Sequence, residues 1–206
     1  PGWEDLSLSQ KEYAYHLSEA AKLGRDITWD QYCKWNLPIR HVVEDILNEY
    51  EGDRECADFQ NFTVYAKRLF FANGIHHHYS EDKFFPECPK EYFQSLMEAV
   101  GDGEQATELL EVIYSPDIYP QRRSTSKTGD IVELSAVNFY DGVTREEVDK
   151  YYNSMMDPND KTPISYGLNT KVVKEDGKVV EKPWKVGGIY GPALEKICAE
   201  LEKAAA

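Results

Sequence analysis

Three consecutive histidines, His76 to His78, are the residues of this chain whose types most directly suggest chemistry. Histidine is the commonest metal ligand and the usual proton carrier near neutral pH. In a strand, His76 and His78 would share one side, and such a pair can chelate zinc if a third ligand is nearby. The nearest candidates for that ligand are Glu81, Asp82 and Cys88.

A structural interpretation of the histidines is also open, and we favour it. The run follows the predicted C-terminus of a helix, where imidazole rings interact well with the negative end of the helix dipole. The rings would then form a loop wall together with Tyr79, Phe84 and Phe85. For this loop we therefore predict no metal ligand and no catalytic residue, and the metal site at His76 and His78 stays open as the alternative.

The remaining motifs of common enzymes are missing from the sequence. The helical zinc-protease motif needs a glutamate directly after its first histidine, but Val42 follows His41 and Leu17 follows His16. We expect His16 to be packed or hydrogen-bonded. No serine nucleophile elbow and no phosphate-binding glycine loop occurs, because the glycines of "GGIYG" (187–191) do not have the dinucleotide-binding spacing.

Composition excludes several classes of partner. The chain has 206 residues, 37 acidic and 23 basic, with a net charge of −14. That balance argues against nucleic acid and against anionic membranes, and it mildly favours a cationic ligand such as a free peptide amine. No apolar run is long enough to span a membrane. The four cysteines are far apart, which predicts buried free thiols.

Hydrophobic periodicity predicts a mainly helical first half. Phe59, Phe62, Ala66, Leu69 and Phe70 form one apolar stripe, with Gly74 placed to end that helix. A capping box at Ser9 and Glu12 predicts the first helix, ending in a left-handed turn at Gly24. Further helices are expected over about 38–50, 89–101 and 104–114, whereas 25–37 reads as irregular. The Arg122–Arg123 pair lies in a predicted loop and is expected to be solvated.

In the second half, the capping and turn residues predict a helix, a hairpin and a final helix. Thr144 and Glu147 form another capping box, for a helix to about Met156. Two β-branched runs flank Asp176-Gly177, and Pro183 places the second strand at an edge. Pro192 opens a last helix that has no stop signal, so we expect a piece of a longer protein. The prediction is an α+β, predominantly helical fold with about seven helices and one hairpin near 170–186. We expect one helical-rich domain over 1–206, possibly divided into 1–114 and 130–206.

Three stretches of the chain together resemble one known family. They are "LSQKEYAYHLSEAAKLGRDI" (8–27), "RLFFANGIHHHYSEDKFFPECPKEYF" (68–93), and the region from "NFYDGVTREEV" to the end (138–206). In order and spacing they are similar to the N-terminal part of the zinc-dependent dipeptidyl peptidase III family, and most of all to its Bacteroidetes members. The resemblance implies a place in the lower lobe of a two-lobed exopeptidase that releases dipeptides from peptides with a free N-terminus.

The resemblance also implies what this chain lacks. Zinc would be held by an HExxGH or HExxxH helix and a further glutamate in the other lobe, and the anchors for the peptide amine would follow Ala206. The chain alone would then be inactive, and its partners would be short peptides and the rest of the same polypeptide. His78 and Tyr79 align with the wall of the subsite for the substrate's first residue. Location would be cytoplasmic, or the cell envelope if a leader preceded Pro1.

Two alternatives to the peptidase interpretation remain at this point. The first is a non-catalytic helical module that binds peptides in a groove. The second is a small metal-binding protein that uses His76 and His78, a possibility that the lack of a clear third ligand weakens.

Overall fold

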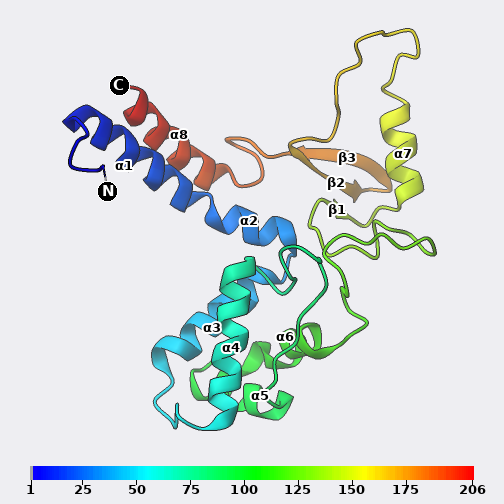
Figure 1. The fold of residues 1–206 in the computed structure, drawn as a ribbon. Coiled ribbons are helices and arrows are strands. Elements are labelled where there is room, and N and C mark those ends of the chain that lie inside the picture. Colours follow the sequence, from blue (N-terminus) through cyan, green and yellow to red (C-terminus); the bar gives the residue numbers. More distant parts are fainter. Residues whose placement is uncertain (1) are drawn as a thin grey trace.

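The computed structural model describes residues 2–206, and it confirms an α+β, predominantly helical fold (Figure 1). A three-stranded sheet accompanies the helices. Among these residues the helices are α1 (Leu8–Leu23), α2 (Arg25–Tyr32), α3 (Asn36–Glu49), α4 (Ala57–Ala72), α5 (Lys90–Ala99), α6 (Gly103–Tyr114), α7 (Arg145–Asn153) and α8 (Gly191–Ala205). The strands are β1 (Tyr140–Asp141), β2 (Thr170–Glu175) and β3 (Lys178–Pro183).

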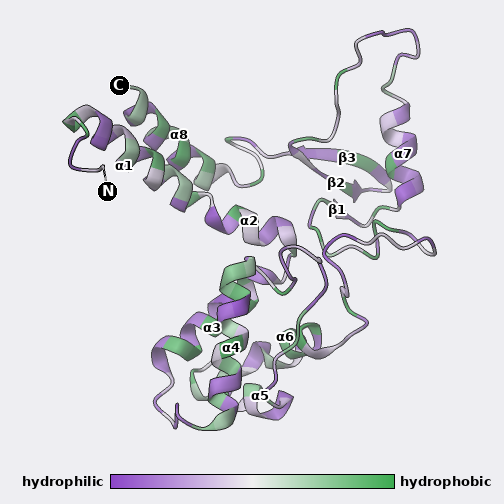
Figure 2. Ribbon diagram, in the orientation of Figure 1, coloured by the Kyte–Doolittle hydropathy of each residue, from purple (hydrophilic) through white to green (hydrophobic). Residues whose placement is uncertain are grey.

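The main core lies among α2 to α6. The predicted stripe of α4 is confirmed, because Phe59, Phe62, Ala66 and Leu69 are all buried in it. Phe93 of α5 meets Phe62 edge-on, with ring centres 5.0 Å apart. Figure 2 shows hydrophobic and hydrophilic residues alternating along these helices, as expected when one side of each helix packs in a core. Burial of these large side chains is the main source of stability for this part of the chain.

The small sheet forms a second, minor cluster. β2 pairs with β1 in parallel and with β3 antiparallel, with Val172 opposite Glu181. The predicted turn is confirmed: Asp176 and Gly177 have φ of 49° and 76°, which suits a tight hairpin. Val143, Val148 and Val172 are buried between the sheet and α7. β3 lies at the edge of the sheet, as Pro183 predicted.

α1 and α8 pack side by side in opposite directions, so the two ends of the chain lie close together (Figure 1). His16 Nδ1 lies 2.7 Å from a Glu200 carboxylate oxygen across this pair, which confirms the prediction of a hydrogen-bonded histidine. Because α1 belongs to the first half and α8 to the second, these contacts cross the predicted 1–114 and 130–206 division. The division itself stays a prediction.

Several sequence predictions need correction. Residues 25–32 are helical rather than irregular, because Trp29 is buried against the main core. The first capping box uses Ser7 and Gln10, not Ser9 and Glu12, so the helix begins earlier. Gly24 has an ordinary φ of −82° and joins two helices instead of forming a left-handed stop. Two cysteines are not buried, Cys56 being half-buried and Cys198 exposed.

Among the helices of residues 2–206, none combines the length and the apolar character needed to cross a bilayer.

Candidate functional site

The histidine loop starts where α4 ends, at a sharp turn held by Asn36. Asn73 is in the left-handed region (φ 55°), and Gly74 follows with φ 146°. A Cβ atom on Gly74 would lie 2.2 Å from Asn36 Nδ2, so a side chain there meets a buried amide. Asn36 Oδ1 accepts from the Ile75 N–H at 3.2 Å. The helix therefore stops at Asn73, one residue before the predicted Gly74, and the loop leaves in a fixed direction.

The three histidines have different surroundings. His76 is buried, and its Nε2 lies 2.8 Å from the Tyr119 carbonyl oxygen. Burial lowers the pKa of His76 to about 4, so its ring is neutral at pH 7. The His77 ring is exposed, and its Nδ1 accepts from the Tyr79 and Ser80 N–H groups, at 3.2 Å each. His78 is half-buried and stacks on the His77 ring, whereas His76 Nε2 is directed at the Tyr119 carbonyl.

Metal-ligand geometry is not found at this loop. Across residues 2–206, no three or more His, Cys, Asp or Glu side chains converge in a way that could hold a metal ion. Two of the possible third ligands, Glu81 and Cys88, interact with other side chains. Glu81 pairs with two arginines, and the buried Cys88 lies near the Tyr114 hydroxyl. The histidine run therefore offers rings and one hydrogen-bonded anchor rather than a ligand set.

An aromatic face forms at the surface of this loop, and we define it as Phe71, His77, His78 and Tyr79. The His77 and His78 rings stack, with centres 4.6 Å apart and planes 29° apart. Phe71 meets His78 edge-on at 4.9 Å, and Tyr79 lies 4.3 Å from it. Phe71 is 73% exposed and Tyr79 85% exposed. Large aromatic rings at such exposure are unusual, and a group of them marks a contact surface.

A small apolar pocket of about 270 Å³ opens beside the aromatic face. His77, His78 and Phe71 line it together with Arg68, Ala72 and Phe84. Of the two predicted site residues, His78 lines the pocket, whereas Tyr79 lies next to the His78 ring and is not among the lining residues. Phe85, expected in the same wall, does not line the pocket either. The volume of this pocket fits one apolar side chain better than a whole ligand.

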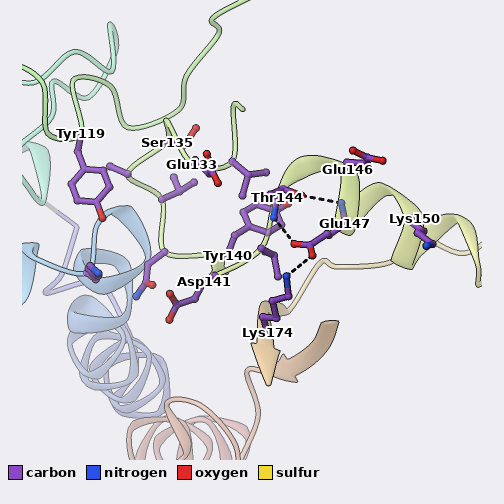
Figure 3. A pocket seen from close by; sticks show the side chains of 17 residues that line it. Tyr119, Glu133, Ser135, Tyr140, Asp141, Thr144, Glu146, Glu147, Lys150 and Lys174 are labelled. Atoms are coloured by element: carbon purple, nitrogen blue, oxygen red, sulfur yellow. Dashed lines mark hydrogen bonds and ion pairs between the residues drawn. The ribbon is translucent and has the colours of Figure 1, made fainter. Parts of the chain in front are cut away.

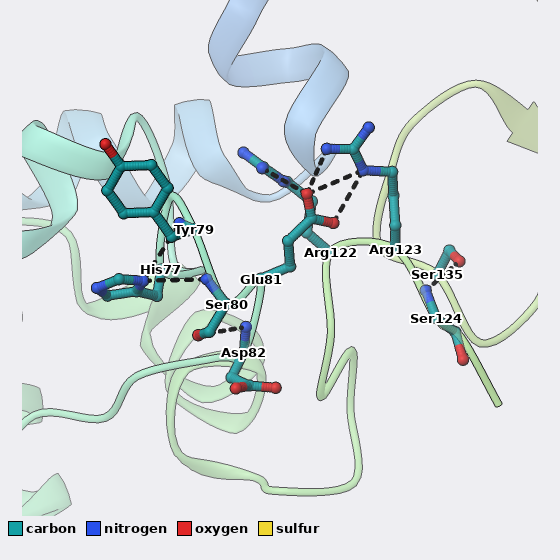
Figure 4. Close-up of polar contacts among 9 residues, drawn as sticks. All are labelled: His77, Tyr79, Ser80, Glu81, Asp82, Arg122, Arg123, Ser124 and Ser135. Atoms are coloured by element: carbon teal, nitrogen blue, oxygen red, sulfur yellow. Dashed lines mark hydrogen bonds and ion pairs between the residues drawn. The ribbon is translucent and has the colours of Figure 1, made fainter.

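Charged groups behind the loop hold it in place (Figure 4). Glu81, with φ 65°, accepts from Arg122 Nη2 and Arg123 Nε, both at 2.8 Å. The expectation that both arginines are solvated is wrong for Arg122, which is only 5% exposed. Its guanidinium lies over the Tyr32 ring of α2. Hydrogen bonds from Arg123 and Arg122 lower the pKa of Glu81 to about 2.

A buried lysine fixes the other side of the loop. Lys83 pairs with His76 as an isolated β-bridge, and its Nζ donates to the carbonyls of Ser115 and Ile118 at 2.6 and 2.7 Å. Burial lowers the pKa of Lys83 to about 8. These carbonyls follow the end of α6, so the lysine connects that helix end to the histidine loop. The base of the aromatic face is thus rigid while its tip is open to solvent.

Sequence reasoning missed Phe71 and Arg68 as parts of this site. The missed signal was the doublet Phe70-Phe71. Leu69 is buried and Phe70 packs against Trp29, so these two residues already cover the side of α4 that faces the core. Phe71, about two helical steps beyond Leu69, lies on the outer side of α4, where its ring meets that of His78. A large exposed aromatic next to a histidine run could have been read as part of a surface site.

The arrangement can bind apolar or aromatic groups. No protein-family model matches this chain, and no curated protein matches it.

Proposed function

We propose that this chain is the non-catalytic wall of a zinc-dependent exopeptidase that releases dipeptides from the N-terminus of short peptides. The observation that carries the proposal is the exposed aromatic face beside the apolar pocket, at the residues that align with the family's first subsite. His78 and Tyr79 would contact the side chain of the first substrate residue. The resemblance described above supplies the reaction, and the face supplies a surface suited to its substrate.

The physical basis is a match of chemistry between face and ligand. Flat rings such as those of His78 and Tyr79 contact apolar and aromatic side chains with little loss of rotamer freedom. The net charge of −14 would favour approach of a peptide that carries a free amine. The fixed base of the loop, held by His76, Lys83 and Glu81, keeps the rings ready for contact.

Zinc has no place among the residues described. The His76 Nε2 faces a backbone carbonyl, and no set of three ligating side chains converges in residues 2–206. These residues do not fit the metal, so the proposal gives this chain no part in holding zinc or activating water. Its part is positional: one side of a cleft and one wall of a subsite.

The gene sequence gives the simplest test. Under the proposal, an HExxGH or HExxxH motif follows the codon for Ala206 within a few hundred residues in the same reading frame. A reading frame that ends without such a motif overturns the proposal.

A kinetic test examines the subsite itself. In the protein encoded by the complete gene, Tyr79→Ala should lower kcat/KM for substrates whose first residue is aromatic, relative to those with alanine there. We expect a change of about two- to tenfold in that ratio, the size of one lost aromatic contact. Tyr15→Ala, which removes an exposed tyrosine of α1, is the matched control and should leave the ratio unchanged. An unchanged ratio in Tyr79→Ala would count against the subsite.

A peptide-binding module without catalysis is the second candidate, and the same aromatic face favours it. Peptide binding by the complete protein without bound zinc and without cleavage would support the module over the peptidase. A histidine-based metal site is not proposed, because His76 is buried against the Tyr119 carbonyl.

A further inference from the structure

An open cleft of about 720 Å³ lies between the loop at Tyr119, the segment 132–143, the first turns of α7, and β2 (Figure 3). Its central polar groups are used by the fold. Glu147 caps α7 by accepting from the Thr144 N–H at 3.1 Å, and it also pairs with Lys174 of β2. These contacts hold α7 against the sheet. The apolar surface that still lacks a partner lies elsewhere, on α1 and α8.

The pair formed by α1 and α8 buries little of its own apolar surface. The helices have 16 and 15 residues, but the buried residue of α1 is the small Ala20, and that of α8 is Gly191, which has no side chain. In Figure 1 the pair extends away from the helical core and from the sheet. Because most of the stability of a short helix comes from packing its apolar side, this pair needs a further surface to pack against.

Apolar residues of the two helices gather on one side of the pair. His16 and Glu200 mark the line along which α1 and α8 meet. From that line, steps of about 100° per residue place one group on the same side of both helices, since the helices run in opposite directions. We call this group the paired-helix face: Tyr13, Leu17 and Ala21 of α1, with Leu194, Cys198, Leu201 and Ala205 of α8. All are exposed except the half-buried Leu194.

The opposite side of the pair does not form a continuous apolar surface. Leu8 and Tyr15 are exposed there. Charged residues separate them from other apolar groups, namely Glu12 and Glu19 of α1 with Lys196 and Lys203 of α8. Only the paired-helix face therefore offers apolar contacts along the length of both helices.

The two outer edges of the paired-helix face carry opposite charge. Lys11, Lys22 and Arg25 follow the outer edge of α1 and its continuation into α2, with no acidic residue on that edge. Glu195 and Glu202 follow the outer edge of α8. Rotation of a second copy by 180° about an axis parallel to the helices places its α8 over α1, and its α1 over α8. Each basic edge then meets the acidic edge of the other copy.

The levels of these charges along the helices also agree. Measured from the contact between α1 and α8 at about 1.5 Å per residue, Lys22 and Glu195 of the second copy lie within about 2 Å of the same level. Lys11 and Glu202 of the second copy lie within about 5 Å. Long side chains can span such offsets. Lys22 also pairs with Glu19 inside α1, so Lys11 gives the cleaner test.

We infer that the paired-helix face is a dimer interface, at which a second copy of this chain completes an antiparallel four-helix bundle. A self-complementary surface of this kind is what a two-fold symmetric dimer requires. A partner with charges of one sign would match only one edge, whereas a second copy matches both. Helices of 15 residues are about 22 Å long, so the interface is small and the expected Kd is micromolar. The inference goes beyond the proposed function and uses none of the residues of the aromatic face.

Sedimentation velocity of the 206-residue chain from about 1 to 200 µM tests the inference. We expect a monomer–dimer equilibrium with a Kd in this range. Leu17→Glu and Leu201→Glu place a charge in the paired-helix face and should each raise the Kd at least about tenfold. Leu8→Glu is the matched control, because it changes a leucine that is 73% exposed on the opposite side and should alter the Kd less than twofold. Circular dichroism checks that each variant keeps its helices.

Charge reversal tests the orientation of the second copy. Lys11→Glu and Glu202→Lys each place like charges opposite one another and should raise the Kd about fivefold, whereas the double variant should return to within twofold of the unmodified chain. An acidic residue near the start of α1 and a basic residue near the end of α8 both suit the helix dipole, so neither change weakens its own helix. The inference is overturned by a monomer at every concentration, in which case another segment or protein covers the face. It is equally overturned if Leu8→Glu weakens the dimer as much as Leu201→Glu, or if the double variant shows no recovery.

Discussion

The guanidinium carbon of Arg122 lies 4.2 Å from the centre of the Tyr32 ring. The same guanidinium donates to Glu81 at 2.8 Å, so one side chain connects α2, the histidine loop and the segment that follows α6. Its Nε is buried without a hydrogen-bond partner among residues 2–206. Arg122 therefore depends on Glu81 and Tyr32 to offset its desolvation.

Arg122→Ala should lower the free energy of unfolding by about 3 kcal/mol, because it leaves the Glu81 charge partly buried without its inner partner. Urea unfolding followed by circular dichroism measures the change. Arg123→Ala is the control: Arg123 pairs with the same carboxylate, but its side chain is 63% exposed, so the loss should be about 1 kcal/mol or less. Equal losses in the two variants would contradict the role given to Arg122.

Protonation of Glu81 should lower the stability of the folded chain at acid pH. Its pKa is about 2 in the folded chain, below its ordinary value of 4.5, so the unfolded chain binds more protons between these values. The stabilisation by Glu81 is complete above about pH 4.5 and is lost as the pH falls toward 2. Glu81→Gln should remove about 2 kcal/mol at pH 7 and much less at pH 2. Stability curves for both proteins over pH 2–7 give the comparison, and parallel curves would refute it.

Protonation of His76 should cause a second loss of stability, at higher pH than that of Glu81. Its pKa is about 4 when folded and 6.5 as a free side chain, so protons favour the unfolded chain as the pH falls from 6.5 to 4. The contribution of neutral His76 is complete above about pH 6.5. The glutamine of His76→Gln cannot be protonated. This variant should therefore lose about 2 kcal/mol less unfolding free energy than the unmodified chain as the pH falls from 6.5 to 4. His41→Gln, at an exposed position of α3, should leave the slope between pH 4 and 6.5 as it is.

Gly74→Ala should destabilise the chain by at least about 2 kcal/mol. A Cβ at this position meets Asn36 Nδ2 at 2.2 Å, and the φ of 146° is rarely adopted by residues with side chains. Thermal unfolding measures the loss. Gly101→Ala provides the control, because Gly101 also has a positive φ (92°) but nothing within 4 Å of its Cβ position. If both variants lose the same stability, the contact with Asn36 has no effect.

Local patterns in the sequence were sufficient for most elements. The α4 stripe, the Thr144 capping box and the Asp176-Gly177 turn all appear as predicted, because each depends on residues within a few positions of one another. α2 was missed for the opposite reason. Its helix is stabilised by Trp29 packing into a core made by other helices, and no periodicity within 25–32 shows that.

The candidate site was predicted only in part. The sequence located a histidine and tyrosine loop after α4, and His78 does line a pocket there. It did not show that Phe71 joins the face or that His76 turns inward to Tyr119. The burial of His76 depends on a contact with Tyr119, 43 positions away, whereas the contact of Phe71 with His78 is local and was overlooked.

The sequence by itself therefore determined the helices other than α2, the hairpin and the absence of common catalytic motifs, since these follow from spacing and residue type. Only the tertiary structure decided that Arg122 is buried, that the three neighbouring histidines have three environments, and that α1 and α8 pack side by side. Burial and pairing of charge depend on which distant segments meet. That is set by the packing of the whole chain, which short-range patterns do not encode.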